Sequence, residues 1–208
     1  MKIKNFITSK NELAVILPKI VKKNYKNLII DLRNNGGGGV GPAFEFAKHI
    51  VNQRVNVGYF VTNKLEYSKY DPKLFKTLPE VIPETTDEFT TRLKKSKGAQ
   101  LIFPKSKNPV FSGNLYVLTN KNTGSTCEPI VYLLKTSKRA TIVGENTAGA
   151  MLSATSFDIS GKYKLGLPIA DFYTYDGVRL DGVGVKPNIE TTSDEALNKA
   201  LSLIKEQE

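Results

Sequence analysis

A serine at the junction of an expected strand and an expected helix is the residue best placed to do chemistry. The apolar run 115–118 has the length and composition of a β-strand, and turn-forming residues follow it at Asn120, Asn122 and Gly124. Ser125 comes next, and the apolar run 130–134 predicts a buried helix after it. A tight turn of this kind exposes the serine side chain, and the free N–H groups of the helix start can hold a developing oxyanion. Ser125 is therefore a candidate nucleophile.

The same spacing is also that of a helix cap. Ser125 and Glu128 form the serine-x-x-glutamate pattern of a capping box, in which each side chain binds the N–H group of the other residue. Pro129 would stand in the first helical turn, where a missing N–H costs least, and it fits both interpretations. Spacing alone leaves Ser125 open between a cap and a nucleophile.

A glycine-rich loop is the second candidate site element. The apolar run 28–30 predicts a short strand buried in a parallel sheet, and it leads into Asp31 and then four consecutive glycines at 36–39. Such a loop lets the backbone approach a ligand closely, although a flexible turn is the alternative. No Gly-Lys-Ser/Thr follows, so the loop is not a phosphate loop. His49 lies in the helix expected from about Pro42, at the edge of its apolar face, and we expect a surface or boundary histidine there rather than a catalytic base.

Composition excludes several classes of function. The chain has 208 residues and a net charge of +10, but its lysines are spread without interleaved aromatics, so we expect a solvated surface and no nucleic-acid partner. One cysteine and one histidine leave no disulfide and no ordinary Cys/His metal centre, and we expect no cofactor. The sequence contains no run of about 18 apolar residues, so we expect no transmembrane segment, and residues 1–8 lack the apolar core of a signal peptide.

The remaining elements place these motifs in one α/β domain spanning 1–208. We expect strands at 55–61 and 140–143, β-hairpins between 151 and 175, and helices from Ser9 to about Asn24 and from Ser193 to about Lys205. Segment 63–107 is rich in Lys, Glu, Thr and Pro and is too long for a plain connection. We expect it to be a lid or inserted subdomain covering one face, with a loosely ordered surface excursion as the alternative.

Four motifs, correctly ordered between about 27 and 189, resemble one family. They are IIDLRNNGGG at 29–38, VLTNKNTGSTCE at 117–128, TIVGENTAG at 141–149 and DGVGVKP at 181–187. Together they resemble the core of the C-terminal processing (tail-specific) and tricorn-type serine peptidases, which the retinoid-binding repeats of interphotoreceptor protein share. The resemblance implies a ClpP/crotonase-like βαβ spiral fold, a serine endopeptidase acting on peptides or proteins, and a cell-envelope or extracytoplasmic location.

The resemblance also implies roles for particular residues. Ser125 occupies the nucleophile position, the backbone N–H of Thr126 would be one oxyanion donor, and Gly37 or Gly38 would supply the other. No metal is implied. A serine hydroxyl is a poor nucleophile near neutral pH, so the site also needs a base.

The base is where the sequence departs from the family. One branch has a lysine about two dozen residues after the serine, and Ala150 stands at that position. The tricorn-like branch uses an N-terminal histidine helped by an acid, usually glutamate, that Asp181 matches; no histidine precedes His49. The resemblance therefore implies a catalytic core whose base belongs to a missing upstream segment. The alternative is a degenerate core that binds a peptide or an apolar ligand without cleaving it.

Overall fold

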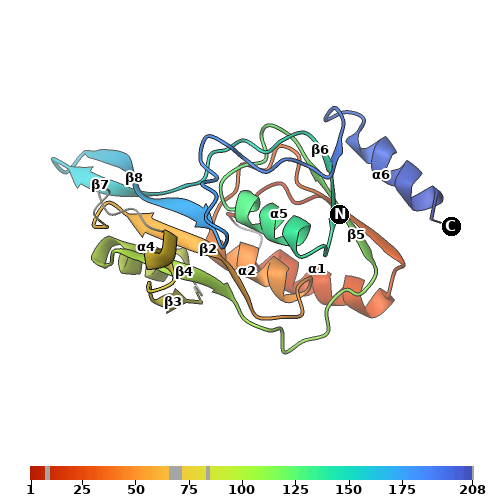
Figure 1. Ribbon diagram of the computed structural model, residues 1–208, viewed down its shortest axis with the longest axis horizontal. Coiled ribbons are helices and arrows are strands. Elements are labelled where there is room, and N and C mark those ends of the chain that lie inside the picture. The colour runs from red at the N-terminus through yellow and green to blue at the C-terminus, as the bar shows by residue number, and fades with distance from the viewer. Residues whose placement is uncertain (8–9, 66–71, 83–84, 208) are drawn as a thin grey trace.

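A parallel sheet forms the centre of the protein in the computed structural model, which describes residues 1–7, 10–65, 72–82 and 85–207 (Figure 1). Its strand order is β1-β5-β6-β9, and all neighbouring pairs are parallel. The strands are β1 (Asn27–Asp31), β5 (Asn114–Thr119), β6 (Thr141–Gly144) and β9 (Ile189–Glu190). Asp31 pairs with Leu118, which pairs with Val143, so the first three strands end at the same edge of the sheet. This α/β core is the fold class expected from the sequence.

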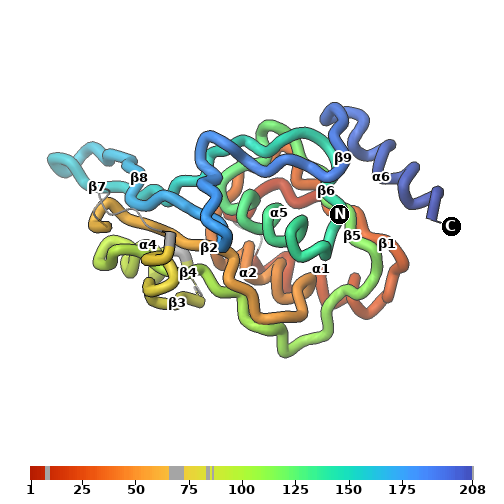
Figure 2. Tube along the Cα trace, in the orientation of Figure 1, coloured from red at the N-terminus to blue at the C-terminus, as the bar shows by residue number. Residues whose placement is uncertain are grey.

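Helices cover both faces of the parallel sheet because its strands alternate two sets of apolar side chains. One face carries Leu115 and Val117 and packs against α1 (Lys10–Lys23), α2 (Val40–Lys48) and α5 (Cys127–Thr136). The other face carries Tyr116 and Leu118 and packs against α6 (Ala196–Lys205). Figure 2 shows α6 beyond β9 at one end of the molecule, with α2 and α5 in its middle.

A second, largely antiparallel sheet extends to the other end of the molecule (Figure 1). Its order is β3-β4-β2-β8-β7. The strands are β2 (Val55–Thr62), β3 (Glu80–Val81), β4 (Gly98–Phe103), β7 (Leu152–Ile159) and β8 (Tyr163–Thr174), accompanied by α3 (Pro72–Phe75) and α4 (Thr86–Lys95). Both β2 and the end of β8 are buried, because α4 covers them with Phe89, whose ring packs edge-on against Phe60.

Segment 63–107 contributes to this sheet rather than forming a loose excursion. Its strand β4 pairs antiparallel with β2 over most of its length, and Phe89 and Leu93 of α4 are buried. The alternative of a loosely ordered excursion is therefore wrong for the described part of this segment. Its side chains also reach the cavity beside Ser125, as described below.

Several expected boundaries shift. The first helix is observed from Lys10 to Lys23 and continues through Pro18, and its expected first residue, Ser9, lies outside the described residues. Of the β-hairpins expected between 151 and 175, one forms, from β7 and the long strand β8. The last helix begins at Ala196, with Glu195 rather than Ser193 at its N-cap. Within the described ranges, none of the helices has both the length and the apolar character needed to cross a bilayer.

Candidate active site

Ser125 lies in a tight turn between β5 and α5, as the sequence predicts. Its φ is +53°, a left-handed conformation that serine adopts rarely and at a cost in backbone energy. The residue is half-buried, and α5 begins two positions later at Cys127. Across the residues the structure describes, no hydrogen bond engages Ser125 Oγ. A strained turn has thus left a hydroxyl free at a helix start, which is the usual geometry of a nucleophile on a strand–turn–helix unit.

Only half of the expected capping box forms. The Glu128 carboxylate accepts the Ser125 N–H at 3.1 Å, but Ser125 Oγ does not cap α5 in return. Glu128 is fully buried and also accepts from the Thr147 hydroxyl at 2.6 Å and from the N–H groups of Gly149 and Ala150, both at 2.8 Å. Glu128 therefore fixes the second glycine loop, 144–149, against the Ser125 turn.

The first glycine loop meets the same turn. A Cβ added to Gly37, whose φ is +94°, would lie 2.6 Å from Ser125 Cβ and 2.9 Å from the Thr126 nitrogen. Only a residue without a side chain permits this approach. The Thr126 hydroxyl donates to the Gly38 carbonyl at 2.6 Å, and the Gly124 N–H donates to the Asn35 carbonyl at 3.0 Å. The loop and the turn, far apart in sequence, are therefore in direct contact.

The backbone donors around Ser125 differ in availability. The Gly37 N–H donates to Asn35 Oδ1 at 2.9 Å, so it is already engaged. Within the described part of the chain, neither the Gly38 nor the Thr126 N–H has a hydrogen-bond partner. Thr126 is the N-cap of α5, where the helix dipole presents partial positive charge. Of the donors expected from the sequence, Thr126 and Gly38 have free N–H groups.

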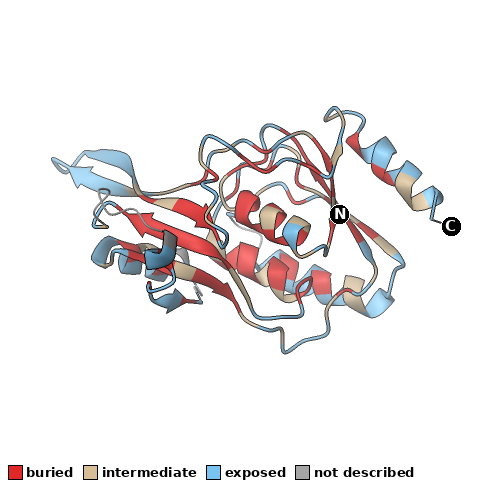
Figure 3. Cartoon of the chain, in the orientation of Figure 1, coloured by how far each residue is buried: buried red, intermediate tan, exposed pale blue. Residues whose placement is uncertain are grey.

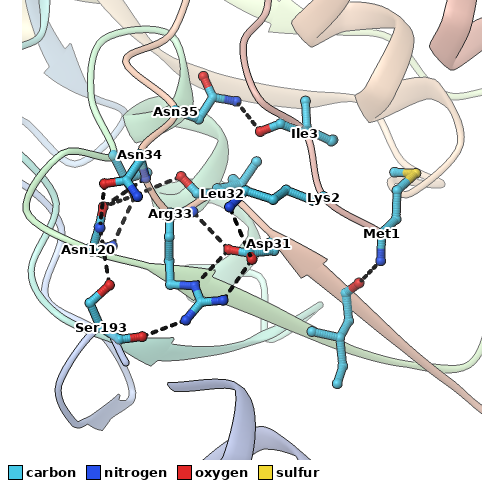
Figure 4. A network of polar contacts seen from close by, with 12 residues as sticks. Met1, Lys2, Ile3, Asp31, Leu32, Arg33, Asn34, Asn35, Asn120 and Ser193 are labelled. Atoms are coloured by element: carbon cyan, nitrogen blue, oxygen red, sulfur yellow. Dashed lines mark hydrogen bonds and ion pairs between the residues drawn. The ribbon is translucent and has the colours of Figure 1, made fainter. Parts of the chain in front are cut away.

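A polar network holds the start of the glycine loop (Figure 4). Arg33 donates to both carboxylate oxygens of Asp31, at 2.9 and 2.8 Å, and to the Ser193 carbonyl. Asn34 and Asn120 exchange two hydrogen bonds, at 3.0 and 2.9 Å, which joins this loop to the end of β5. Burial acts to raise the pKa of Asp31, but the hydrogen bonds and charge of Arg33 outweigh it and lower the pKa, so the carboxylate stays ionised.

Cys127 is not an alternative nucleophile, although it is two residues from Ser125. It is fully buried in the core. Burial, with the nearby Glu128 charge, raises the pKa of its thiol to about 12. Since the thiolate is the reactive form, this cysteine is inert near neutral pH.

An apolar cavity of about 240 Å³ opens beside Ser125 and Thr126. It lies between α2, α4, the second sheet and the start of α5, and its apolar lining includes Phe44, Phe60, Phe89, Phe103, Ile130 and Met151. Leu101 and Phe103 come from β4 and Phe89 from α4, so segment 63–107 forms one wall. The cavity can accept an apolar side chain while leaving the adjacent backbone at Ser125.

Of the two base-related positions expected from the sequence, Ala150 lies near the turn and Asp181 belongs to a loop beside the second glycine loop. A Cβ built on Gly124 would lie 3.8 Å from the Ala150 Cβ, so a side chain at 150 stands next to Ser125. Asp181 belongs to the loop that packs on the second glycine loop through the Gly182 N–H, which donates to the Gly149 carbonyl at 2.7 Å. The Asp181 carboxylate binds Arg179 at 3.0 Å. Arg179 thus binds one oxygen of the Asp181 carboxylate.

His49 is buried, which corrects the expectation of a surface or boundary histidine. Its exposed fraction is 4%, because the segment at Phe111 packs over the end of α2 and donates its N–H to the His49 carbonyl. Nε2 lies 3.3 Å from the Glu45 carboxylate, and among the described residues Nδ1 has no hydrogen-bond partner. The glycine loop precedes α2 and His49 follows it, so the helix, about 13 Å long at 1.5 Å per residue, separates the imidazole from Ser125.

Sequence reasoning missed two residues that position the site. Asn35 joins the glycine loop to the Ser125 turn, and Glu128 joins the turn to the second glycine loop. Glu128 was interpreted only as half of a capping box, since its contacts with Thr147, Gly149 and Ala150 depend on tertiary structure. The available signal was the placement of polar residues directly after β1 and β5, whose ends meet at one sheet edge.

Two curated C-terminal processing peptidases are among the proteins similar to this chain. The C-terminal processing peptidase of the chloroplast of Tetradesmus obliquus is 27% identical over 173 residues, covering 83% of this chain and 30% of that protein. The carboxyl-terminal-processing protease of Synechocystis is 24% identical over 177 residues, covering 85% of this chain and 34% of that protein. The chain thus spans about a third of the length of these curated relatives.

Solved structures show the same fold. A putative peptidase from Parabacteroides merdae superposes with a TM-score of 0.71 at 16% identity, covering 98% of this chain and 59% of that one. The photosystem II D1 C-terminal processing protease superposes with a TM-score of 0.65 at 23% identity, covering 93% of this chain and 42% of that one. The tricorn protease superposes with a TM-score of 0.62 at 18% identity, covering 100% of this chain and 17% of that one. Because the family model Peptidase family S41 matches residues 1–191, the chain belongs to that peptidase family.

Proposed function

We propose that this chain is the core of a serine endopeptidase in which Ser125 attacks the peptide carbonyl. The observation that carries the proposal is the free Ser125 hydroxyl in a strained turn, with the unpartnered N–H groups of Gly38 and Thr126 beside it. Membership of a peptidase family supports the same chemistry. The relatives that the chain matches are C-terminal processing peptidases, which favours peptide or protein substrates.

The reaction forms and then hydrolyses an acyl-enzyme. Ser125 Oγ bonds to the carbonyl carbon while a base takes its proton, and the carbonyl oxygen becomes an oxyanion facing Gly38 and Thr126. The C–N bond then breaks as the base returns the proton to the leaving amine. Water attacks the Ser125 ester in the second half, which releases the acid and restores the hydroxyl.

The base comes from outside the described chain. Ala150 has no titratable group, and His49 is buried with Glu45 at the far end of α2. An imidazole carried by an upstream segment would complete the site, and Asp181 would orient it after releasing Arg179. The role of Asp181 stays a prediction until such a segment is present.

The apolar cavity would select the side chain next to the scissile bond. Its aromatic and aliphatic walls favour a medium-sized apolar side chain over a charged one. The lid role of segment 63–107 is then tested with Phe89→Leu, because deleting the whole segment would remove β4 from the sheet. A change in the preferred side chain across a peptide library supports the wall assignment, and an unchanged preference contradicts it.

A degenerate binding module is the second candidate, favoured by the empty base position at Ala150. In that case the cavity and donors hold a peptide without cleaving it. Binding by the wild-type chain, with no cleavage in any longer form of the protein, would identify this function.

The proposal is tested by comparing peptide hydrolysis by this chain with hydrolysis by a longer protein that includes any coding sequence preceding Met1. We expect activity in the longer protein only, and its loss in Ser125→Ala. Removing one member of such a catalytic set typically leaves only about 10³–10⁴-fold acceleration over water, so the shorter chain should be nearly silent. Full activity of this chain, abolished by His49→Ala, would overturn the proposal and make His49 the base.

A further inference from the structure

The hairpin formed by β7 and β8 carries an uncovered apolar face. Phe157 pairs with Leu165, Ile159 with Tyr163, and Thr155 with Leu167, and cross-strand partners point to the same side of a sheet. This places five large apolar side chains on one face, between 40% and 70% exposed: Phe157, Ile159, Tyr163, Leu165 and Leu167. We call these five residues the apolar ladder.

The opposite face of the hairpin is polar, so the ladder is a one-sided pattern. Ser156, Asp158 and Lys164 alternate with the ladder residues, and Lys164 lies 4.0 Å from Asp158 across the strands. A strand pair patterned in this way normally buries its apolar face. Here both faces of the outer hairpin are exposed (Figure 3), and an apolar patch of this kind marks an interaction site.

Helix α4 covers the root of this face and ends beside the ladder. Phe89 of α4 packs on Phe60, next to Phe172 of β8, while the Lys94 ammonium near the end of α4 lies 5.2 Å from the Phe157 ring centroid. The ladder is therefore the continuation, beyond α4, of the face that lines the cavity beside Ser125.

Strand β7 connects the ladder to the candidate active site. Its first residues, Leu152, Ser153 and Ala154, line the cavity that also contacts Ser125, and its last residue, Ile159, belongs to the ladder. β7 is the terminal strand of its sheet, so its outer edge presents unpaired N–H and C=O groups. An extended chain lying on this edge would run about 17 Å from Ala154 to Ile159.

We propose that the apolar ladder and the free edge of β7 form an exosite for an extended apolar segment of the polypeptide substrate, remote from the bond at Ser125. The inference rests on the proposed peptidase function. Backbone pairing with β7 would hold the segment, and the ladder would contact every second side chain. A second copy fits this surface less well, because the Lys94 ammonium lies over the Phe157 ring of the ladder and the whole chain carries +10, so two copies would repel each other.

The test measures binding to the full chain as Ser125→Ala, so that no peptide is consumed. Two fluorescent peptides share the same cavity-filling end; one has about four residues and the other about ten, long enough at ~3.3 Å per residue to reach the ladder with alternating apolar residues. We expect the long peptide to bind at least about tenfold more tightly, since burying one apolar side chain is worth that factor. N-methylating alternate amides of the long peptide should reduce the gain, because it removes donors for pairing.

Three double variants locate the gain. Leu165→Ser with Leu167→Ser should remove it while leaving short-peptide affinity unchanged. Leu165→Met with Leu167→Met keeps the surface apolar and should retain it. Leu197→Ser with Leu201→Ser removes equally exposed leucines from α6, at the other end of the molecule, and should also retain it. Circular dichroism melts verify that each variant folds.

The proposal is overturned if both peptides bind with equal affinity, or if the Leu165→Ser, Leu167→Ser variant still binds the long peptide more tightly than the short one. The proposal is also overturned if the wild-type chain forms a concentration-dependent dimer that the Leu165→Ser, Leu167→Ser variant does not form, because the ladder would then bind a second copy. It is likewise overturned if that variant loses binding to phosphatidylglycerol vesicles and the long peptide shows no gain in affinity, because the ladder would then bind a lipid surface. A length gain that persists although no form of the protein hydrolyses peptides would reject the proposed peptidase function and leave the exosite intact.

Discussion

The two ends of helix α2 carry two kinds of group that a serine peptidase needs together, and the structure keeps them apart. At its start, the glycine loop contacts the Ser125 turn, which offers a free hydroxyl and two free N–H groups but no base. At its end lies His49, the single imidazole of the chain, whose Nε2 faces the Glu45 carboxylate rather than Ser125. The comparison teaches that residue types alone say little about activity here. Placement by one short helix separates the groups that would have to act together.

The two ends also differ in how their polar groups are used. Around Ser125, Glu128 and Asn35 accept the surrounding N–H groups and so fix the backbone, while Oγ itself stays free. Around His49, the imidazole is enclosed: Nε2 faces Glu45, and Nδ1 is buried with no hydrogen-bond partner in the described part of the chain. In the first region hydrogen bonds hold the backbone and leave the hydroxyl free, and in the second the imidazole is buried.

Adding a base to the Ser125 region should have the largest effect. Ala150 stands beside the turn, so Ala150→Lys would bring an amine to the serine. We expect peptide hydrolysis to rise about 10²-fold or more, the usual contribution of a general base, and to increase with pH as the lysine loses its proton. A continuous peptide assay on the purified variant checks this.

Two matched variants make that result specific. Ala150→Met adds similar bulk without an amine and should stay as inactive as the wild type. Ala150→Lys combined with Ser125→Ala should lose the whole gain. Equal activity of the lysine and methionine variants would contradict the account of a site that lacks only its base.

Weakening the anchor of the turn should have the next largest effect. Glu128→Gln keeps the volume of the side chain but replaces one acceptor oxygen with an amide donor. This donor would face some of the four groups that now donate hydrogen bonds to the carboxylate. We expect a loss of about 3 kcal/mol in the free energy of unfolding, since buried donors are left unsatisfied. Urea unfolding measures this, and a loss below about 1 kcal/mol would show that Glu128 is not the anchor.

A side chain at Gly37 should distort the contact between loop and turn. Its positive φ and the 2.6 Å approach to Ser125 Cβ leave no room for a methyl group. Gly37→Ala should cost about 1–3 kcal/mol of unfolding free energy and reduce the activity of the lysine-bearing variant. Gly36→Ala is the control, because a Cβ there meets nothing within 4 Å. Similar losses in both variants would reject the close contact.

Much of the Ser125 region could be predicted because its signals are local. The strand 115–118, the turn residues and the helix after them follow from a short stretch of sequence, and β5 and α5 appear where expected. The glycine loop followed in the same way from the short strand ending at Asp31. The glycine loop and the Ser125 turn can meet only if their strands are parallel and end at the same edge of the sheet. The pattern of short apolar runs implied such a parallel sheet.

The rest depended on distant contacts that no local pattern reveals. His49 was expected near the surface because its own helix shows it at the edge of the apolar face. The Phe111 segment, some sixty residues away in the chain, covers it. Strand β4 was hidden in a charged segment, since its burial comes from pairing with β2 and packing under α4. Glu128 looked like a cap because its other partners follow about twenty positions later.

Changes at the other end of α2 should have the smallest effect on activity. His49→Gln should leave hydrolysis by the lysine-bearing variant unchanged within about twofold, because the imidazole does not face the substrate. His49→Phe should alter the unfolding free energy by no more than about 1 kcal/mol, since the ring loses one contact to Glu45 and no unpaired Nδ1 remains. A large loss of hydrolysis in His49→Gln would show that His49 takes part in the reaction at Ser125, which would contradict the separation of the two regions.

Acylation by an activated ester tests the central claim most directly, namely that Ser125 and its N–H donors are ready to react before any base is added. An ester with a good leaving group needs little help from a base, so the oxyanion donors at Gly38 and Thr126 should suffice. After incubation of the wild-type chain with a p-nitrophenyl ester of an apolar acid, peptide mass spectrometry should find the acyl group on Ser125. The Ser125→Ala chain should lack that adduct. An adduct spread over surface lysines, equal in both proteins and absent from Ser125, would contradict the account.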